Sequence, residues 1–394
     1  MAPINFFPFL YFALWHHSCP HSHSQVHGNC IKTERIALLS IKAGMWSNNK
    51  SFLSSWTGHD CCNWRGVSCN NETGHVTKLD LQYPYYDPIH PIPPPSKLNS
   101  SLIQLHHLNY LDLSNNDFQG FPIPDFIGSL ANLDYLNLSN AEFSGILPHT
   151  FGNLSCFGVD LSNVHGWLHD INMLPSLLVL KLSNAGLRVG GIHGTTLLHH
   201  LNFTSLRVLD LSMNYDLNIT LPQWLFHLTS LVHLDLSICA LYGKLPVTIG
   251  NLRSLRFLSL TQNSFDGVIP ESMGNLGSLE KLDLSVNKFN GSIPESLSNL
   301  TNLEYFDLSS NQVQGLMPAS IGDLETCNTD LSRNMISGAL SRFLGNLTLL
   351  QYFSASGGNN LSGNLPETIG NLVHLQFLDL SKKYDAWKVA GEFW

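Results

Sequence analysis

The chain has 394 residues, a formal net charge of −9 and only 12% charged residues. Proteins that bind nucleic acid present a basic surface, so this acidic balance argues against a nucleic acid as partner. One compact core seldom grows to such a length, whereas an architecture that adds repeated units does.

The first 24 residues are predicted to form a signal peptide. An apolar run over Ile4–Trp15 is shorter than the roughly 20 residues of a membrane span. Small residues at Ser22 and Ser24 fit cleavage before Gln25. No other stretch of the sequence is long and apolar enough to cross a bilayer, so we expect a secreted, extracellular chain without a membrane span.

Residues 25–78 are predicted to form a small N-terminal cap with disulfides. Four of the eight cysteines lie here, namely Cys30, Cys61, Cys62 and Cys69. Neighbouring cysteines bridge each other only with strain. The sequence therefore allows Cys30–Cys61 with Cys62–Cys69, or the crossed pairing. The spacing does not repeat C-x₂-C as a zinc site would, and export favours disulfides.

A short helix is expected between the first two cap cysteines. Thr33 can cap its N-terminus, because a threonine hydroxyl accepts from the first free backbone N–H groups. Ile36, Leu39 and Ala43 are expected to form its buried face.

Residues 79–383 repeat one sequence motif, and the last copy is incomplete. The quartet L-x-L-S or a close variant recurs about 13 times, with a step of 24 residues from Leu234 to Phe306. The fullest copy, Leu252–Asn275, reads LRSLRFLSLTQNSFDGVIPESMGN. The quartets begin at Leu79, Leu111, Leu136, Val159, Leu180, Leu209, Leu234, Leu258, Leu282, Phe306, Thr329, Phe353 and Leu378. A fixed period of this length is typical of a solenoid.

Each repeat predicts one half-buried strand followed by a turn. Alternation puts Leu258 and Leu260 inward, and Phe257, Ser259 and Thr261 outward. One strand cannot bury its face alone, so the strands stack in parallel into a concave sheet. After each strand, the amide of an asparagine can satisfy buried backbone groups of the turn. This position holds Asn116, Asn214, Asn263, Asn287, Asn311 and Asn334, and in one repeat Cys239.

Two columns of outward side chains on the concave strands are candidates for a ligand site. Exposed aromatic residues favour binding because they supply large rigid contact area. These ligand candidates are Tyr110, Tyr135, His233, Phe257, Tyr305, Tyr352 and Phe377. The neighbouring column is mostly acidic, but the repeat motif LDLS places an aspartate at this position in most repeats, which explains the acidic residues without a ligand. It reads Asp112, Asn137, Asp160, Lys181, Asp210, Asp235, Ser259, Asp283, Asp307, Asp330, Ser354 and Asp379.

Eleven N-x-S/T sequons predict glycosylation of an exported chain that carries little charge. Their asparagines are Asn49, Asn71, Asn99, Asn137, Asn153, Asn202, Asn218, Asn290, Asn299, Asn346 and Asn360. A sugar on Asn137 would block part of the concave face.

No pattern of residues predicts catalysis, a cofactor or a metal. The sequence has no G-x-S-x-G, no H-E-x-x-H, no phosphate-binding glycine loop and no kinase signature. The adjacent pairs His106–His107 and His199–His200 are expected on loops or facing solvent, not as ligands. Cys156, Cys239 and Cys327 are expected to be buried free thiols. A proline-rich insert over Tyr83–Lys97 is expected to be an extended surface loop.

The repeat wording resembles that of plant extracellular leucine-rich-repeat proteins. The shared features are G-x-I-P after the asparagine turn, I-G-N-L at the next repeat, and a head that begins CIKTERIALLSIKAG. Residues 108–155 and the irregular middle resemble the receptor-like proteins grouped with receptors for fungal ethylene-inducing xylanase. The resemblance implies an α/β repeat solenoid, a plant-type superhelix with a parallel β-sheet on its concave face. It also implies the pairing Cys30–Cys61 and Cys62–Cys69.

The resemblance further implies non-catalytic recognition of an extracellular peptide, glycan or microbial protein, as in receptors of plant immunity. Such full-length receptors continue into more repeats, a cysteine cap and a membrane span, and they signal through a partner receptor kinase at the plasma membrane. Residues 384–394 instead form an off-pattern tail, which we interpret as truncation. Two alternatives stay open: a soluble inhibitor of a microbial wall-degrading enzyme, resembling polygalacturonase inhibitors, and a non-functional truncated copy.

Overall fold

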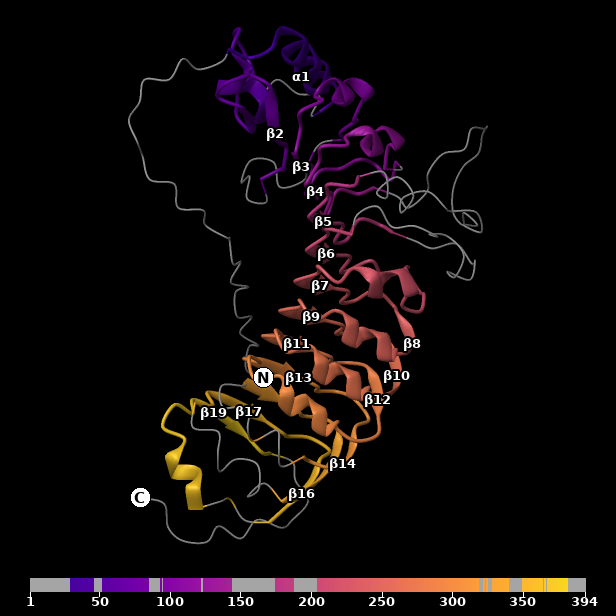
Figure 1. The fold of residues 1–394 in the computed structure, drawn as a ribbon, viewed down its shortest axis with the longest axis vertical. Coiled ribbons are helices and arrows are strands. Elements are labelled where there is room, and N and C mark those ends of the chain that lie inside the picture. Colours follow the sequence, from indigo (N-terminus) through magenta and orange to yellow (C-terminus); the bar gives the residue numbers. More distant parts are fainter. Residues whose placement is uncertain are drawn as a thin grey trace.

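The computed structural model describes residues 29–45, 52–84, 93, 95–121, 123–143, 174–187, 204–318, 322, 324, 328–339, 349–363, 365 and 367–381. The predicted signal peptide, the tail over 384–394, His199–His200, Cys156, Cys327 and most of the proline-rich insert lie outside these residues. The described chain forms an elongated, curved solenoid with the cap at one end (Figure 1).

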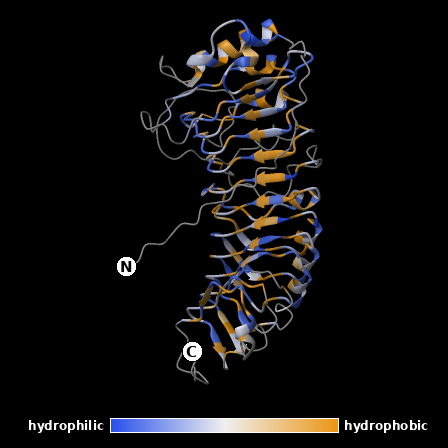
Figure 2. Ribbon diagram, turned by 90° about the vertical axis from the view of Figure 1, so that its left-hand side faces the viewer, coloured by the Kyte–Doolittle hydropathy of each residue, from blue (hydrophilic) through white to orange (hydrophobic). Residues whose placement is uncertain are grey.

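One large sheet lines the concave side of the solenoid (Figures 1 and 2). Its first strand, β1 (Val67–Cys69), belongs to the cap and pairs antiparallel with β2 (Val76–Asp80). All later strands are parallel, with one repeat supplying one strand. In order they are β3 (Tyr110–Asp112), β4 (Tyr135–Asn137), β5 (Val179–Lys181), β6 (Val208–Asp210), β7 (His233–Asp235), β9 (Phe257–Ser259), β11 (Lys281–Asp283), β13 (Tyr305–Asp307), β15 (Asn328–Asp330), β17 (Tyr352–Ser354) and β19 (Phe377–Asp379).

The strand predicted at Val159 lies outside the described residues. Within the described part of the chain, β4 pairs with β5, Leu136 opposite Leu180. The large sheet has 13 strands there, and the first of them is the cap strand β1.

Two smaller parallel sheets follow the asparagine turns, and we call them the lateral sheets. One contains β8 (Tyr242–Lys244), β10 (Ser264–Val268) and β12 (Lys288–Asn290), and the other β14 (Gln314–Leu316), β16 (Met335–Ala339) and β18 (Asn360–Ser362). Short 3₁₀ helices then cover the convex side: η3 (Ser100–Gln104), η4 (Asp125–Ser129), η5 (Gln223–His227), η6 (Val247–Asn251), η7 (Glu271–Asn275), η8 (Glu295–Asn299) and η12 (Glu367–Asn371).

Leucine columns form the core between these layers. Leu258 and Leu260 are fully buried, as the alternation predicts, and their equivalents in neighbouring repeats form one continuous cluster. Close packing also fixes glycine at two turns of the convex side. A Cβ at Gly250 would lie 2.5 Å from the Ser272 carbonyl oxygen, and one at Gly274 would lie 2.3 Å from that of Ser296.

The cap contains α1 (Lys32–Gly44), η1 (Phe52–Ser55) and η2 (Cys61–Asn63). The prediction for its helix was wrong in two respects. The helix starts one residue before Thr33 and has no side-chain cap, and its buried residues are Glu34, Ala37, Leu38 and Ile41. Ile36 is 54% exposed. The buried face was missed because it contains a charged residue, which periodicity places on the solvent side.

The residue before each buried asparagine adopts a left-handed backbone conformation. Small polar residues such as Asn115 and Asn140 suit this conformation, and their side chains hydrogen-bond each other over 3.2 Å. Val286 occupies the same position with φ of 52° and is 45% exposed. A β-branched side chain is strained in this region.

Val286→Asn is therefore expected to raise the free energy of unfolding by about 1 kcal/mol, because it relieves this strain without removing a core contact. Thermal unfolding measures the change. The matched control is Val268→Asn, at a 58% exposed strand residue that is not among those with positive φ. Equal stabilisation by both substitutions would refute the explanation from backbone strain.

Candidate functional site

The aromatic candidates lie in one column on the concave sheet, which we call the concave column. Strand pairing puts one residue of each repeat at the same level, for example Tyr110 beside Tyr135 and His233 beside Phe257. In order the column contains Lys78, Tyr110, Tyr135, Val179, Val208, His233, Phe257, Lys281, Tyr305, Asn328, Tyr352 and Phe377. All are half-buried except Phe377, which is 45% exposed.

Neighbouring rings of the column stack face to face. The ring centroids are 4.0 Å apart for Tyr110–Tyr135, 4.1 Å for His233–Phe257 and 4.6 Å for Tyr352–Phe377, with interplanar angles of 12° or less. Because stacked rings cover each other's facing sides, these three pairs turn ring edges to the solvent. Such a surface offers a rigid apolar strip to a partner.

Two lysines belong to this column, which the sequence analysis did not recognise. The Lys78 ammonium lies 4.1 Å from the centre of the Tyr110 ring. Lys281 sits between two rings, 5.1 Å from that of Phe257 and 4.7 Å from that of Tyr305. Reading the column in register, rather than searching for aromatic residues alone, would have found them. Cations over ring faces contribute favourable electrostatic contacts.

The acidic column beside it has a structural role, as its repeat wording suggested. In most repeats the aspartate accepts from the backbone N–H two residues later, for example Asp283 Oδ1 from Ser285 over 3.1 Å and Asp330 Oδ1 from Ser332 over 2.8 Å. These bonds close the turn after the strand. They also explain why parts of this column are buried instead of outward-facing, with Asp112 only 4% and Asn137 only 8% exposed.

Burial of this surface raises the pKa of several of its acids. Burial and the charges of Asp210 and Asp283 raise the pKa of Asp235 to about 6, although the hydrogen bonds from Ser237 oppose this rise. Burial and the neighbouring Asp283 bring that of Asp307 to about 6 as well. The Tyr305 hydroxyl donates to Asp307 Oδ2 over 3.0 Å, and burial together with the Asp307 charge raises the pKa of Tyr305.

Burial lowers the pKa of His233 to about 4. The folded protein therefore binds a proton at this ring less well than the unfolded chain does. The resulting stabilisation is present above pH 6.5 and is lost as the pH falls towards 4.

His233→Phe is expected to keep the stack on Phe257 but to remove this loss. When the pH falls from 7.5 to 4.5, the free energy of unfolding should decrease in both proteins. The decrease should be smaller in the variant by up to about 2 kcal/mol, a figure reduced for solvent screening. Thermal unfolding across this range measures the difference. Protonation of Asp235 and Asp307 stabilises the folded state as the pH falls, which opposes the effect of His233. Both aspartates are present in the variant and in the wild type, so their contribution cancels in the comparison. Parallel pH curves would contradict the prediction.

The buried asparagine column acts as predicted. Asn263 Nδ2 donates to the carbonyl oxygens of Leu236 and Leu260 over 2.8 and 2.9 Å. Its Oδ1 accepts from the backbone N–H groups of Cys239 and Leu241 over 3.1 and 2.9 Å. Each asparagine thus links its own repeat to the one before it. Cys239 occupies the same position as a buried free thiol whose pKa burial raises to about 12, so it is unreactive.

The exposed sequons lie away from the concave column. Asn71, Asn218, Asn290, Asn299 and Asn360 are exposed, and Asn290 and Asn360 are on the lateral sheets. Asn49, Asn153, Asn202 and Asn346 lie outside the described residues.

Two other sequons are engaged in the fold, and the structure argues against a glycan on either. Asn137 is 8% exposed, and its Nδ2 donates to Asp112 Oδ2 over 2.9 Å. Asn99 Nδ2 donates to the Ser40 carbonyl over 2.9 Å. A sugar attached to either nitrogen would have to displace these contacts.

The cap joins the first repeats through disulfides and one buried carboxylate. The structure pairs Cys30 with Cys61 and Cys62 with Cys69, with Cα–Cα distances of 5.3 and 5.5 Å. This is the pairing that the family resemblance implied. The Sγ atoms of Cys30, Cys61 and Cys62 lie within 4.8 Å of one another, but both disulfides commit them, so they do not form a metal site.

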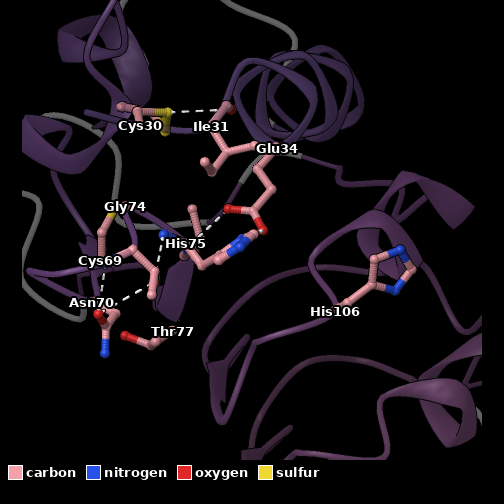
Figure 3. A network of polar contacts seen from close by, with 12 residues as sticks. Cys30, Ile31, Glu34, Cys69, Asn70, Gly74, His75, Thr77 and His106 are labelled. Atoms are coloured by element: carbon pink, nitrogen blue, oxygen red, sulfur yellow. Dashed lines mark hydrogen bonds and ion pairs between the residues drawn. A yellow bond between two sulfur atoms is a disulfide. The ribbon is translucent and has the colours of Figure 1, made fainter. Parts of the chain in front are cut away.

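Glu34 is the buried carboxylate at this junction (Figure 3). It is 3% exposed, its Oε2 accepts from the Val76 N–H over 2.7 Å, and its Oε1 lies 2.8 Å from His75 Nδ1. The His75 ring in turn lies on that of His107, 3.9 Å away. The contacts connect α1 with the entries to β2 and β3. This network could not be predicted from the sequence, because its residues are far apart in the chain.

Comparison with known protein families agrees with this geometry. A model described as "Leucine-rich repeat region" matches residues 162–325, and "Leucine Rich Repeat" matches residues 107–130 and 132–154. "Leucine rich repeat N-terminal domain" matches residues 31–70, the cap. The fold and these matches agree with a leucine-rich-repeat solenoid that begins with an N-terminal cap.

The chain is similar to plant receptor-like proteins. It is 31% identical over 264 residues to Receptor-like protein EIX1 of Solanum lycopersicum. The aligned region covers 56% of this chain and 25% of that protein. It is 34% identical over 189 residues to Receptor-like protein 39 of Arabidopsis thaliana, covering 47% and 20%. The chain thus spans about a quarter of the length of these relatives. Both are named as receptor-like proteins, not as enzymes.

Two solved receptor structures share the fold. One is the Arabidopsis receptor kinase HAESA ectodomain in complex with an extended IDA peptide hormone, with a TM-score of 0.64 and 29% identity over 89% of this chain and 57% of that one. The other is PEPR1–AtPEP1, with a TM-score of 0.65 and 26% identity over 90% and 49%. Among the residues described, no helix is long and apolar enough to cross a membrane.

Proposed function

We propose that this chain recognises an extracellular ligand on its concave face and performs no chemistry on it. The observation that carries the proposal is the concave column, a rigid strip of stacked rings in register on one open sheet. Rigid aromatic surface is the composition that binding sites favour. The exposed sequons among the described residues leave this strip free of sugar.

Two similar receptor structures support a receptor role for this chain. The HAESA ectodomain is described in complex with a peptide hormone, and PEPR1 with AtPEP1. In our proposal this chain likewise binds a polypeptide outside the cell. A longer receptor-like protein that contains it would be anchored at the plasma membrane and pass the signal to a partner receptor kinase.

A glycan placed on the concave face tests the proposal. Lys281→Asn with Asp283→Ser creates a sequon in β11, and serine already occupies the position of Asp283 in another repeat, at Ser259. Asp266→Asn with Val268→Thr creates a matched sequon on a lateral sheet, in β10 next to Asn290 of β12. The secreted proteins are compared for binding of peptides selected on the wild type from a displayed random library.

We expect the concave glycan to abolish peptide binding and the lateral glycan to leave it unchanged. Mass spectrometry confirms occupancy, and thermal unfolding confirms that both variants fold. If no selected peptide is sensitive to the concave glycan, the assignment of this face as the ligand site is wrong.

A further inference from the structure

At one place in the concave column, two tyrosines flank a short polar residue. Tyr305 on β13 lies opposite Asn328 on β15, and Asn328 Oδ1 accepts from the backbone N–H of Tyr352 on β17 over 2.9 Å. Strands are spaced by about 4.8 Å, so the tyrosine backbones are separated by roughly 10 Å. We call the space over Asn328 between the two rings the tyrosine slot.

Each tyrosine has one ring face covered on the side away from the slot. The Lys281 ammonium lies 4.7 Å from the centre of the Tyr305 ring, on the β11 side. The Phe377 ring stacks on that of Tyr352 at 4.6 Å, on the β19 side. Among the described residues, no second ring or ammonium is seen against either tyrosine. We infer that the other face of each ring is open to the slot.

The preceding strands show what fits between rings at this spacing. Phe257, Lys281 and Tyr305 lie on β9, β11 and β13, with the lysine ammonium 5.1 and 4.7 Å from the two ring centres. The order is ring, cation, ring. From β13 to β17 the order is ring, asparagine, ring. The chain therefore supplies its own cation at one such position and not at the next.

Carboxylates surround the slot on both sides. Asp330 Oδ2 accepts from the Tyr352 hydroxyl over 3.2 Å, and Asp307 Oδ2 accepts from the Tyr305 hydroxyl. On the other side, Glu304 lines a cavity together with Asn328, Leu349, Gln351 and His374.

Among the described residues, these carboxylates have no cationic partner. Arg256 Nε donates to Glu280 Oε1 over 2.7 Å one strand before Glu304. In contrast, the described part of the chain places no lysine or arginine in an ion pair with Glu304, Asp307 or Asp330. Burial and, after it, the charges of Asp283 and Asp330 raise the pKa of Asp307.

We propose that the tyrosine slot binds the guanidinium group of an arginine side chain carried by a polypeptide ligand. A planar cation matches two facing rings, and its fork of N–H donors can reach the Glu304 carboxylate. Arginine fits better than lysine, because guanidinium stacks on rings and is more weakly hydrated than ammonium. Uncharged sugars would leave the surrounding carboxylates unpaired. The inference rests on the proposed function, since it assumes that the concave face is the ligand face.

The test uses a defined probe, an acetylated and amidated Gly-Ser-Arg-Ser-Gly peptide, and its analogue with citrulline in place of arginine. Citrulline keeps the shape and loses the charge. Binding to the whole chain is measured by saturation-transfer NMR at low salt. We expect saturable binding of the arginine peptide and about tenfold weaker binding of the citrulline peptide.

Three variants locate the site. Asn328→Lys places the chain's own ammonium between the rings, as Lys281 does one step earlier, and should abolish binding. Glu304→Gln should weaken binding by about fivefold, because it removes the ion-pair partner. Glu280→Gln is the matched control, since Arg256 already pairs with that carboxylate, and it should leave binding unchanged. Unchanged melting temperatures show that the variants are folded.

Equal binding of both peptides, undiminished binding to the Asn328→Lys variant, or no binding at all would overturn the inference. These outcomes differ from a failure of the proposed function. If library peptides are blocked by the concave glycan yet show no preference for arginine, the ligand face stands and only the slot is refuted.

Discussion

Asn263→Ala is expected to lower the free energy of unfolding by about 3–5 kcal/mol, because it leaves several buried backbone groups without partners. Asn263 donates to three carbonyls, those of Leu236, Leu260 and Thr261, and accepts from two backbone N–H groups of the preceding repeat. A buried group that loses its partner costs about 1–3 kcal/mol. Chemical unfolding followed by circular dichroism measures the loss.

Gln262→Ala is the control for this substitution, at the exposed neighbour of Asn263. It should change stability by less than about 0.5 kcal/mol. A loss of that small size for Asn263→Ala as well would show that water can replace the side chain. The asparagine column would then not be what joins the repeats.

The second large effect is expected from the disulfide Cys30–Cys61. Its two cysteines are 31 residues apart, whereas Cys62 and Cys69 are 7 apart. A cross-link restricts the unfolded chain more when it closes a longer loop. Replacing Cys30 and Cys61 together by alanine should therefore cost about 3–4 kcal/mol, and replacing Cys62 and Cys69 about 2–3 kcal/mol.

The cap provides its own probe for this comparison. Trp56 and Trp64 are buried and stacked at 5.3 Å, so near-ultraviolet circular dichroism follows their packing. We expect the Cys30/Cys61 variant to lose this signal at lower denaturant concentration than the Cys62/Cys69 variant. The reverse order would mean that loop length does not decide how the cap is stabilised.

The sequence predicted the parts of the fold that depend on period. The leucines of the strands, the parallel register and the asparagine bonds repeat every turn, so that each copy supports the interpretation of the next. The disulfide pairing did not follow from spacing and came from the family resemblance. The strand predicted at Val159 lies outside the described residues and stays a prediction.

Features that depend on contacts between distant residues could not be predicted in this way. The buried face of α1 is set by the Val76 N–H, 42 residues from Glu34. Asn137 is a sequon by its sequence and a buried donor to Asp112 in the fold. Lys281 is an ordinary polar residue until strand pairing puts it between two rings. That the aromatic candidates bind a ligand stays a prediction.

The one-strand-per-repeat register has a consequence for how such a surface diversifies. Because each 24-residue unit adds a single position to the column, gaining or losing a unit moves all later positions by one strand spacing, about 4.8 Å. The hydrogen-bonding pattern of the flanking units is unaffected, since every unit offers the same edges to its neighbours. Unequal crossing-over between units would thus lengthen or shorten the binding column by whole strand spacings, and with it the length of ligand that fits. Point substitutions would instead change which ligand side chain is accepted at each position.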